Sequence, residues 1–162
     1  LETERALEQY AHLGILADVA CMSMDIASQS GSTVVGVEKV NDGQIAVVTL
    51  SRPETQNKLD LGTSAALVAI FRALKDDERV LAVVMTGAGD SFCVGASTAA
   101  FGGELETIAI RDNGGEHLMP TLVVQGMLEM GKPIIGAING PAIAGGFEIA
   151  LACDILVGSP RA

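Results

Sequence analysis

The chain has 162 residues and a formal net charge of −10, and its residues are 49% apolar but only 3% aromatic. This length suits a single domain with its own core, built mainly from aliphatic side chains. The acidic balance argues against non-specific binding to nucleic acid or to anionic membranes.

The three cysteines lie far apart, at positions 21, 93 and 153, and the chain has only two histidines. This pattern indicates buried thiols in a reducing compartment and gives little support to a disulfide framework or a metal site. No apolar run reaches about 18 residues, and the N-terminal segment is acidic. We therefore expect a protein of the cytoplasm or an organelle matrix, with no membrane partner and no secretion signal.

The first part of the chain is predicted to be helical. Residues 2–27 contain no proline and carry spaced apolar side chains, which is typical of a helix. The segment 29–32, Gln-Ser-Gly-Ser, has the composition of a flexible joint. These features predict a helical N-terminal extension over 1–31 and a core over 32–162.

Two strands are predicted next, at 33–40 and 44–50. Asn41-Asp42-Gly43 between two β-branched runs is a strong hairpin signal. Pro53 cannot continue a ladder, so the second strand ends there. Arg52 then presents a cation at a strand end, where it is either a ligand contact or an ordinary surface residue.

A helix and a buried strand follow. Asn57 is predicted to cap a helix that runs to about Leu74, with Asp60 in its first turn. Its core-facing stripe consists of Leu67, Ile70, Phe71 and Leu74. Residues 80–85 form an almost continuous apolar run, which predicts a strand covered on both faces.

The Gly-rich segment 86–97 fits neither of two familiar motifs. A dinucleotide-binding fingerprint would need glycine where Phe92 stands, and a nucleophile elbow would need glycine where Ala99 stands. The scarcity of histidine also leaves a Ser-His-Asp triad poorly supplied. What remains is a loop after a buried strand, whose backbone N–H groups near Gly95 and Ala96 are candidate hydrogen-bond donors.

The following Gly-rich region, 97–117, is predicted to be a mobile loop with one short helix, forming a lid or pocket wall. Pro120 fits the first turn of a helix to about Met130. An apolar strand over 133–138 and a short strand over 155–158 complete the pattern. Strands that alternate with helices predict an α/β fold with parallel pairing.

The segment between these last two strands carries the candidate site. Gly145 and Gly146 open a helical pattern, and the first N–H groups of a helix have no partner within it. Glu148 lies one turn further on. Backbone donors beside a carboxylate are the arrangement that stabilises an oxyanion or enolate while a proton moves. Glycines for tight packing and a glutamate favoured by the helix dipole explain this segment equally well.

These motifs resemble those of the enoyl-CoA hydratase/isomerase (crotonase) family. The matching segments occur in the family's order and spacing over residues 33–162: 51–53 with Asn57, 83–89, 92–96, 132–141 and 144–154. The resemblance implies a spiral of repeated ββα turns, of which this chain carries the N-terminal part of the core. The family's C-terminal part, with a second acidic position, is then expected to lie beyond Ala162.

The resemblance also implies a site. Ala96 and Gly145 match the two N–H donors that hold the thioester oxygen, and Glu148 matches the first acidic position that activates water. The substrate-binding residues expected from the resemblance are Arg52, Gly95, Ser97, Gly146 and Phe147. Ser97 stands where the family usually has aspartate, next to the adenine of coenzyme A (CoA). The substrate is then an acyl-CoA thioester, and no cofactor or metal is expected besides its CoA.

The reaction predicted from this resemblance is hydration of a 2-enoyl-CoA in fatty acid metabolism, a lyase reaction. Enoyl-CoA isomerisation, decarboxylation and C–C hydrolysis are alternatives within the family. A non-catalytic acyl-CoA-binding or assembly subunit is an alternative of another class. The resemblance further implies a homo-oligomer, either a trimer or a hexamer formed by two trimers.

Overall fold

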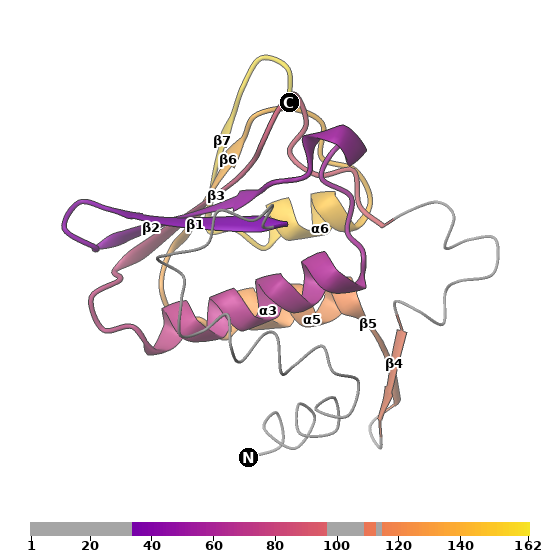
Figure 1. Ribbon diagram of the computed structural model, residues 1–162, viewed down its shortest axis with the longest axis horizontal. Helices are drawn as coiled ribbons and strands as arrows, with labels where there is room; N and C mark the ends of the chain where they lie inside the picture. Colours follow the sequence, from indigo (N-terminus) through magenta and orange to yellow (C-terminus); the bar gives the residue numbers. More distant parts are fainter. Residues whose placement is uncertain (1–33, 97–108, 113–114) are drawn as a thin grey trace.

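The computed structural model describes residues 34–96, 109–112 and 115–162, and these form a main sheet with helices packed on it and a separate two-stranded sheet (Figure 1). The predicted helix over 2–27, the extension over 1–31 and the predicted binding residue Ser97 lie outside the described residues. Within these ranges, no helix has both the length and the apolar character needed to cross a membrane.

The first two strands form the predicted hairpin. Strand β1 (Val35–Val40) pairs antiparallel with β2 (Ile45–Leu50), and Val40 lies opposite Ile45. Asn41 and Asp42 in the connecting turn have φ of 52° and 55°. Asparagine and aspartate enter this left-handed region more readily than most residues, which explains why they occupy the turn.

The main sheet has five strands in the order β1-β2-β3-β6-β7, with β3 at Ala82–Gly87, β6 at Ile134–Ile138 and β7 at Ile155–Gly158. From β2 to β7 each strand is parallel to its neighbour, as the sequence predicts. Parallel neighbours need crossover connections. These contain the helices α3 (Leu61–Asp76), α5 (Met119–Leu128) and α6 (Gly145–Leu151), respectively.

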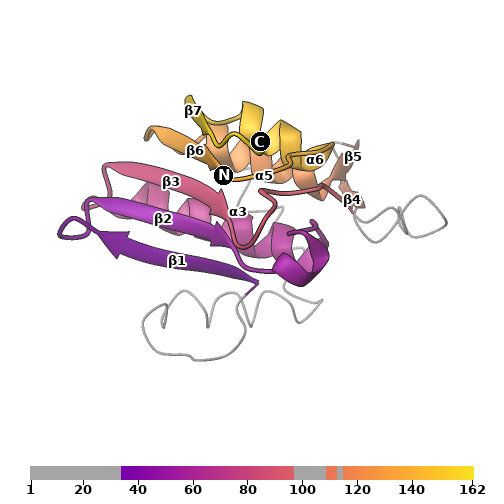
Figure 2. The same cartoon turned by 90° about the horizontal axis from the view of Figure 1, so that it is seen from above.

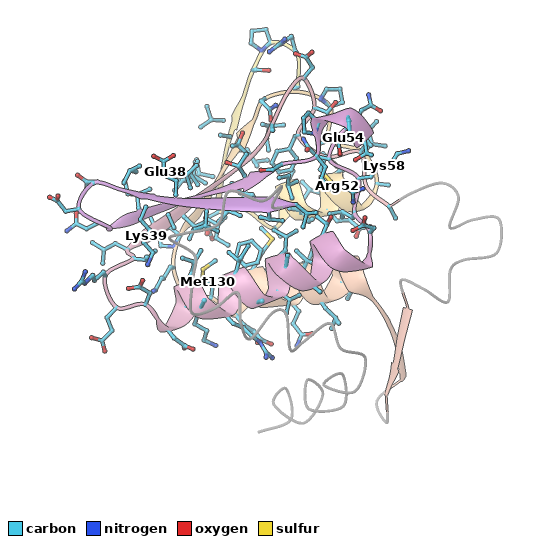
Figure 3. The ribbon with its side chains drawn as sticks, viewed as in Figure 1. Glu38, Lys39, Arg52, Glu54, Lys58 and Met130 are labelled. Atoms are coloured by element: carbon cyan, nitrogen blue, oxygen red, sulfur yellow. The ribbon has the colours of Figure 1, made fainter. Side chains whose placement is uncertain are left out.

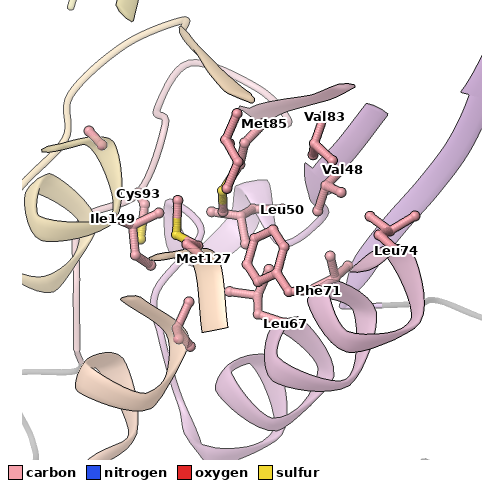
Figure 4. Close-up of a cluster of buried hydrophobic side chains, with 14 of the residues drawn as sticks. Val48, Leu50, Leu67, Phe71, Leu74, Val83, Met85, Cys93, Met127 and Ile149 are labelled. Carbon is pink, nitrogen blue, oxygen red and sulfur yellow. The ribbon is translucent and has the colours of Figure 1, made fainter. Parts of the chain in front are cut away.

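The core lies between the sheet and the helices α3 and α5, which run side by side under it (Figures 1 and 2). Leu67, Phe71 and Leu74 of α3 are buried as predicted, whereas Ile70 is only half-buried. The sheet meets them with Val48, Leu50, Val83 and Met85 (Figure 4). Each such side chain contributes roughly 1.5–3 kcal/mol when it leaves water.

The predicted cap of α3 is wrong. Asp60 is the N-cap residue, and its Oδ1 accepts a hydrogen bond of 2.8 Å from the N–H of Thr63. Asn57 lies in a left-handed turn before the helix, with φ of 56° and 1% exposure. The short 3₁₀ helix η2 (Pro53–Thr55) turns the chain before α3 begins. The side-chain amide of Asn57 therefore faces the loop after β3, where it donates hydrogen bonds, and does not cap α3.

The structure also corrects part of the loop predicted over 97–117. Strands β4 (Ala109–Asp112) and β5 (Gly115–Leu118) form a separate antiparallel pair, in which Asp112 lies opposite Gly115. The sequence between them is Asn113-Gly114, a dipeptide that strongly favours two-residue hairpin turns. The composition-based loop prediction overlooked this signal.

Candidate active site

The structure brings the two Gly-rich segments together at one end of the sheet. They follow β3 and β6, which are parallel neighbours, so both segments leave the sheet at the same edge. The N–H groups of Phe92 and Cys93 both donate to the oxygen of Pro141, at 3.1 and 3.2 Å. In return, the N–H of Ile143 donates to the oxygen of Cys93 at 2.9 Å, and Cys93 forms a parallel bridge with Ala142.

Two glycines allow these segments to approach more closely than side chains would permit. A Cβ atom on Gly146 would lie 2.1 Å from the oxygen of Cys93. A Cβ atom on Gly95, whose φ is +78°, would lie 2.6 Å from the oxygen of Ile143 and 3.0 Å from the nitrogen of Gly145. Gly95 and Ala96 therefore lie beside the first residue of α6.

The two predicted donors are free to bind a ligand. Among the described residues, neither the N–H of Ala96 nor that of Gly145 has a hydrogen-bond acceptor. The N–H of Gly146 already donates to the oxygen of Ile143 at 2.9 Å. Of the two glycines that begin α6, Gly145 is therefore the one whose N–H has no acceptor among the described residues. The structure thus brings Ala96 and Gly145 together, and their role in oxyanion binding stays a prediction.

Glu148 projects from the same face of α6 as Gly145, because residues three apart on a helix lie on one face. Its side chain is exposed, and it makes no ion pair with a described residue. Ala144, which precedes α6, has φ of 49°, a region that is costly for a residue with a Cβ atom. This backbone strain next to the donors was not foreseen from the sequence.

Arg52 lies near this end of the sheet, but its positive charge is already paired with carboxylates of the chain. Its guanidinium contacts the carboxylate of Asp60, lies 3.4 Å from the hydroxyl of Thr63 and 3.8 Å from a carboxylate oxygen of Glu54. Burial alone would raise the pKa of Asp60, but hydrogen bonds from Thr63 and Arg52 outweigh it and lower that pKa. Its predicted contact with substrate stays a prediction.

The remaining predicted binding residues differ in their surroundings. Gly146 is buried against Cys93, so its missing side chain serves the close approach of α6 to the loop. Phe147 is 50% exposed and extends the apolar side of α6 together with Ile143, which is 54% exposed.

Two asparagines that hold the first loop were missed as functional residues. The side chain of Asn57 donates to the oxygen atoms of Ala88 and Ser91, at 2.9 and 2.8 Å. The side chain of Asn139 donates to Gly89 and Ser91, at 2.9 and 3.3 Å. Both belong to the motifs quoted above, but hydrogen bonds across such sequence distances are not visible in a local pattern.

The thiols of Cys93 and Cys153 are poor nucleophiles. Burial raises the pKa of each to about 11, and the carboxylate of Asp154 adds to the effect at Cys153. Since the thiolate is the reactive form, neither cysteine suits covalent catalysis at neutral pH. Over the described ranges, no group of three His, Cys, Asp or Glu side chains is arranged to hold a metal ion.

The fold is that of known enoyl-CoA hydratases. The chain superposes on an enoyl-CoA hydratase from Bacillus anthracis with a TM-score of 0.69 and 25% identity, covering 80% of this chain and 49% of the other. A probable enoyl-CoA hydratase/isomerase from Mycobacterium abscessus gives 0.65 and 33%, covering 80% and 48%. These structures confirm the crotonase-like α/β fold.

The sequence places the chain in the same family. A profile of the family described as enoyl-CoA hydratase/isomerase matches residues 41–162, so the chain belongs to this family. It is 45% identical over 121 residues to a probable peroxisomal enoyl-CoA hydratase of Arabidopsis thaliana, covering 75% of this chain and 43% of that relative. An (E)-benzylidenesuccinyl-CoA hydratase of Thauera aromatica is 41% identical over 122 residues, with coverage of 73% and 44%. The chain spans a little under half the length of these curated relatives.

Proposed function

We propose that this chain forms the acyl-CoA-binding and oxyanion-stabilising part of a 2-enoyl-CoA hydratase. The observation that carries the proposal is the bridge between Cys93 and Ala142, which sets Ala96 beside Gly145. The relatives named above are hydratases of CoA thioesters, and this supports the same reaction class here.

In the proposed reaction, the N–H groups of Ala96 and Gly145 donate to the thioester oxygen. As the water oxygen bonds to C3 of the enoyl group, the electron pair of the C2–C3 double bond shifts toward the thioester carbonyl, and the thioester oxygen becomes the enolate oxygen. Each oxyanion donor is typically worth roughly 10²–10³ in rate. Glu148 accepts the proton of the attacking water and returns it to C2 as the enolate collapses, so that the carboxylate is regenerated and both parts of the water molecule are placed on the product. CoA enters as part of the substrate, and no other cofactor is required.

The test is Glu148→Gln, which keeps the size of the side chain but removes the base. We expect turnover of a short 2-enoyl-CoA to fall by roughly 10²–10⁴, because general base catalysis is lost, whereas the affinity for acyl-CoA stays within a few-fold. Glu78→Gln is the matched control, since Glu78 is exposed in the turn between α3 and β3. Unchanged turnover in Glu148→Gln would contradict the assignment.

A second candidate is a non-catalytic binding or assembly subunit. Ile143, two residues before α6, and Phe147 and Leu151 within α6 are 54%, 50% and 60% exposed, and β7 adds three exposed side chains, Ile155, Leu156 and Val157. An exposed apolar patch of this kind is typical of a surface that another protein segment covers. Retention on immobilised CoA without turnover of any 2-enoyl-CoA would favour this candidate. The oligomeric state, a trimer or a hexamer, stays a prediction that light scattering can test. The location in the cytoplasm or an organelle matrix also stays a prediction.

A further inference from the structure

We propose that Ala144 is a positioning residue of the proposed oxyanion site. Its methyl group contacts the segment around Gly95 and thereby sets the gap between the N–H groups of Ala96 and Gly145. The inference rests on the proposed function, because it concerns how the two proposed donors are spaced. It adds no chemical step to the reaction.

The first argument is the backbone conformation of Ala144. The N–H of Gly146 donates to the oxygen of Ile143 at 2.9 Å, which closes a four-residue turn with Ala144 at its first central position. Its φ of 49° and ψ of −124° match that position of a type II′ turn, at about +60° and −120°. Glycine dominates this position because a residue with a Cβ atom is strained there. Alanine is therefore an unfavourable residue at 144.

The strain at Ala144 is not offset by its side chain. All other described non-glycine residues with positive φ carry polar side chains: Asn41, Asp42, Gln56 and Asn57. Asparagine and aspartate tolerate such a φ because their side chains bond to nearby backbone groups. The methyl group of Ala144 cannot do this, and it is exposed, so it gains little from leaving water. A residue that breaks a local rule without a stabilising gain points to a role in the site beside it.

The second argument is the surroundings of the methyl group. A Cβ atom on Gly95 would lie 3.2 Å from the Cβ of Ala144 and 3.0 Å from the nitrogen of Gly145. The Cβ of Ala144 therefore faces Gly95, and the peptide bond after Gly95 carries the N–H of Ala96. The methyl group thus lies at the contact between the two segments that carry the proposed donors.

The third argument is that other contacts already fix the direction of each donor. In a trans peptide the C=O and N–H groups point in opposite directions, and none of the described peptide bonds is cis. The oxygen of Ala144 accepts hydrogen bonds of 2.8 and 3.0 Å from N–H groups in the first turn of α6, so the N–H of Gly145 points away from the helix. The oxygen of Gly95 accepts one of 2.9 Å from Leu59, which fixes the peptide of Ala96 in the same way. The methyl group is left to set the spacing.

The spacing matters because both donors must reach one oxygen atom. A donor is effective at about 2.7–3.1 Å from the oxygen on which charge develops, and it must already be in place when the reaction occurs. Without the methyl group the two segments can relax toward each other, since a packed structure partly closes a small void. A displaced donor then stabilises the enolate less, whereas the ground-state thioester, which carries less charge, is affected less. The expected signature is a lower kcat with little change in KM.

The experiment measures thermal unfolding and the turnover of a short 2-enoyl-CoA for the whole chain, as wild type and as Ala144→Gly. Glycine relieves the strain, so the midpoint of thermal unfolding is expected to rise by roughly 2–6 °C. We expect kcat to fall roughly tenfold, less than the 10²–10³ for removal of a whole donor, because here the donor is only displaced. KM is expected to stay within about twofold. A purely structural role would not raise stability and lower kcat together.

Two further variants separate the methyl group from the strain. Ala144→Ser keeps a Cβ atom at this position and is expected to retain most of kcat, because the spacer remains. Asp42→Gly relieves a positive φ of 55° in the exposed turn between β1 and β2 and is expected to leave kcat unchanged. That turn precedes β2, whereas the site follows the end of the parallel strand β3. Figure 3 shows the two ends of the sheet, with Lys39 near the turn and Arg52 near the site.

Three results would overturn the proposal: a kcat of Ala144→Gly equal to that of the wild type, an unfolding midpoint of this variant that does not rise, or a loss of kcat in Ala144→Ser as large as that in Ala144→Gly. If the wild type turns over no 2-enoyl-CoA, the proposed function itself fails, and the inference falls with it. An active wild type and an equally active Ala144→Gly overturn only the role of Ala144.

Discussion

Asn57 and Asn139 donate hydrogen bonds to the same backbone oxygen, that of Ser91, from opposite sides of the loop after β3. Asn57 follows β2 and Asn139 follows β6, so strands on both sides of β3 contribute. Asn57 also accepts a hydrogen bond from the N–H of Arg52 at 2.9 Å, and Asn139 accepts one from the N–H of Gly87 at 3.2 Å. The two amides therefore position the loop that leads to the proposed donor Ala96.

Replacing either asparagine by alanine should destabilise the chain by about 1–3 kcal/mol, because the backbone oxygen of the buried Ser91 and that of a second residue, Ala88 or Gly89, each lose a hydrogen-bond donor. The double variant should lose more than the sum, with a coupling of about 0.5–3 kcal/mol, since only then is the Ser91 oxygen deprived of both donors. Urea unfolding of the two single variants and the double variant measures this. Gln125→Ala, on the exposed side of α5, is a control expected to change stability by less than about 0.5 kcal/mol. Strict additivity would show that the two amides act independently.

Gly146→Ala tests the close approach of α6 to the first loop. The new Cβ would overlap the oxygen of Cys93, so α6 must move away, and we expect a loss of about 1–3 kcal/mol together with weaker acyl-CoA binding. Gly126→Ala is the matched control in α5, where the nearest atom would be 4.0 Å away. That variant should be stabilised by about 0.5–1 kcal/mol, because alanine is the better helix residue. Thermal unfolding of both variants checks the contrast, and equal shifts would argue against a special role of Gly146.

The fold was predictable because its signals are local. Asn41-Asp42-Gly43 marks a hairpin, and continuous apolar runs mark β3 and β6, so periodicity alone leads to parallel α/β pairing. The sequence does not identify the N-cap residue of α3, because Asn57 and Asp60 are both residue types that cap helices well. The choice between the two residues depends on the turn around Asn57, whose side-chain amide donates to the oxygens of Ala88 and Ser91. Because these partners are more than thirty positions away in the sequence, a local pattern does not reveal them.

The candidate site was predictable in part. Gly145 and Glu148 stand out because a glycine at a helix start and a carboxylate one turn later have a chemical meaning of their own. The contacts that bring Ala96 to Gly145 join residues about fifty positions apart, and no local pattern encodes them. The prediction that Ala96 and Gly145 act together therefore rests on the resemblance to the family motifs.

The raised pKa of the two described cysteines predicts slow alkylation. With a pKa of about 11 for both Cys93 and Cys153, only about one thiol in a thousand is ionised at pH 8. Native protein treated with iodoacetamide at pH 8 should therefore show little modification of either residue in peptide mass spectra. Protein unfolded in guanidinium chloride should be modified at both, because burial no longer raises their pKa. Rapid modification in the native state would contradict the burial of these thiols.

The lowered pKa of Asp60 predicts a pH-dependent contribution to stability. A carboxylate whose pKa is lower in the folded chain stabilises the fold above its unfolded pKa, and this stabilisation is lost as the pH falls through the folded value. Asp60→Asn keeps a side chain that caps helices well but removes the charge that contacts Arg52. The variant should therefore be less stable than the wild type at pH 7, and the difference should shrink as the pH falls below the ordinary value of 3.8. Unfolding midpoints in urea at pH 7 and at acidic pH measure this, and a difference that persists unchanged in acid would mean that the hydrogen bond to Thr63, rather than the charge, accounts for the effect of the substitution.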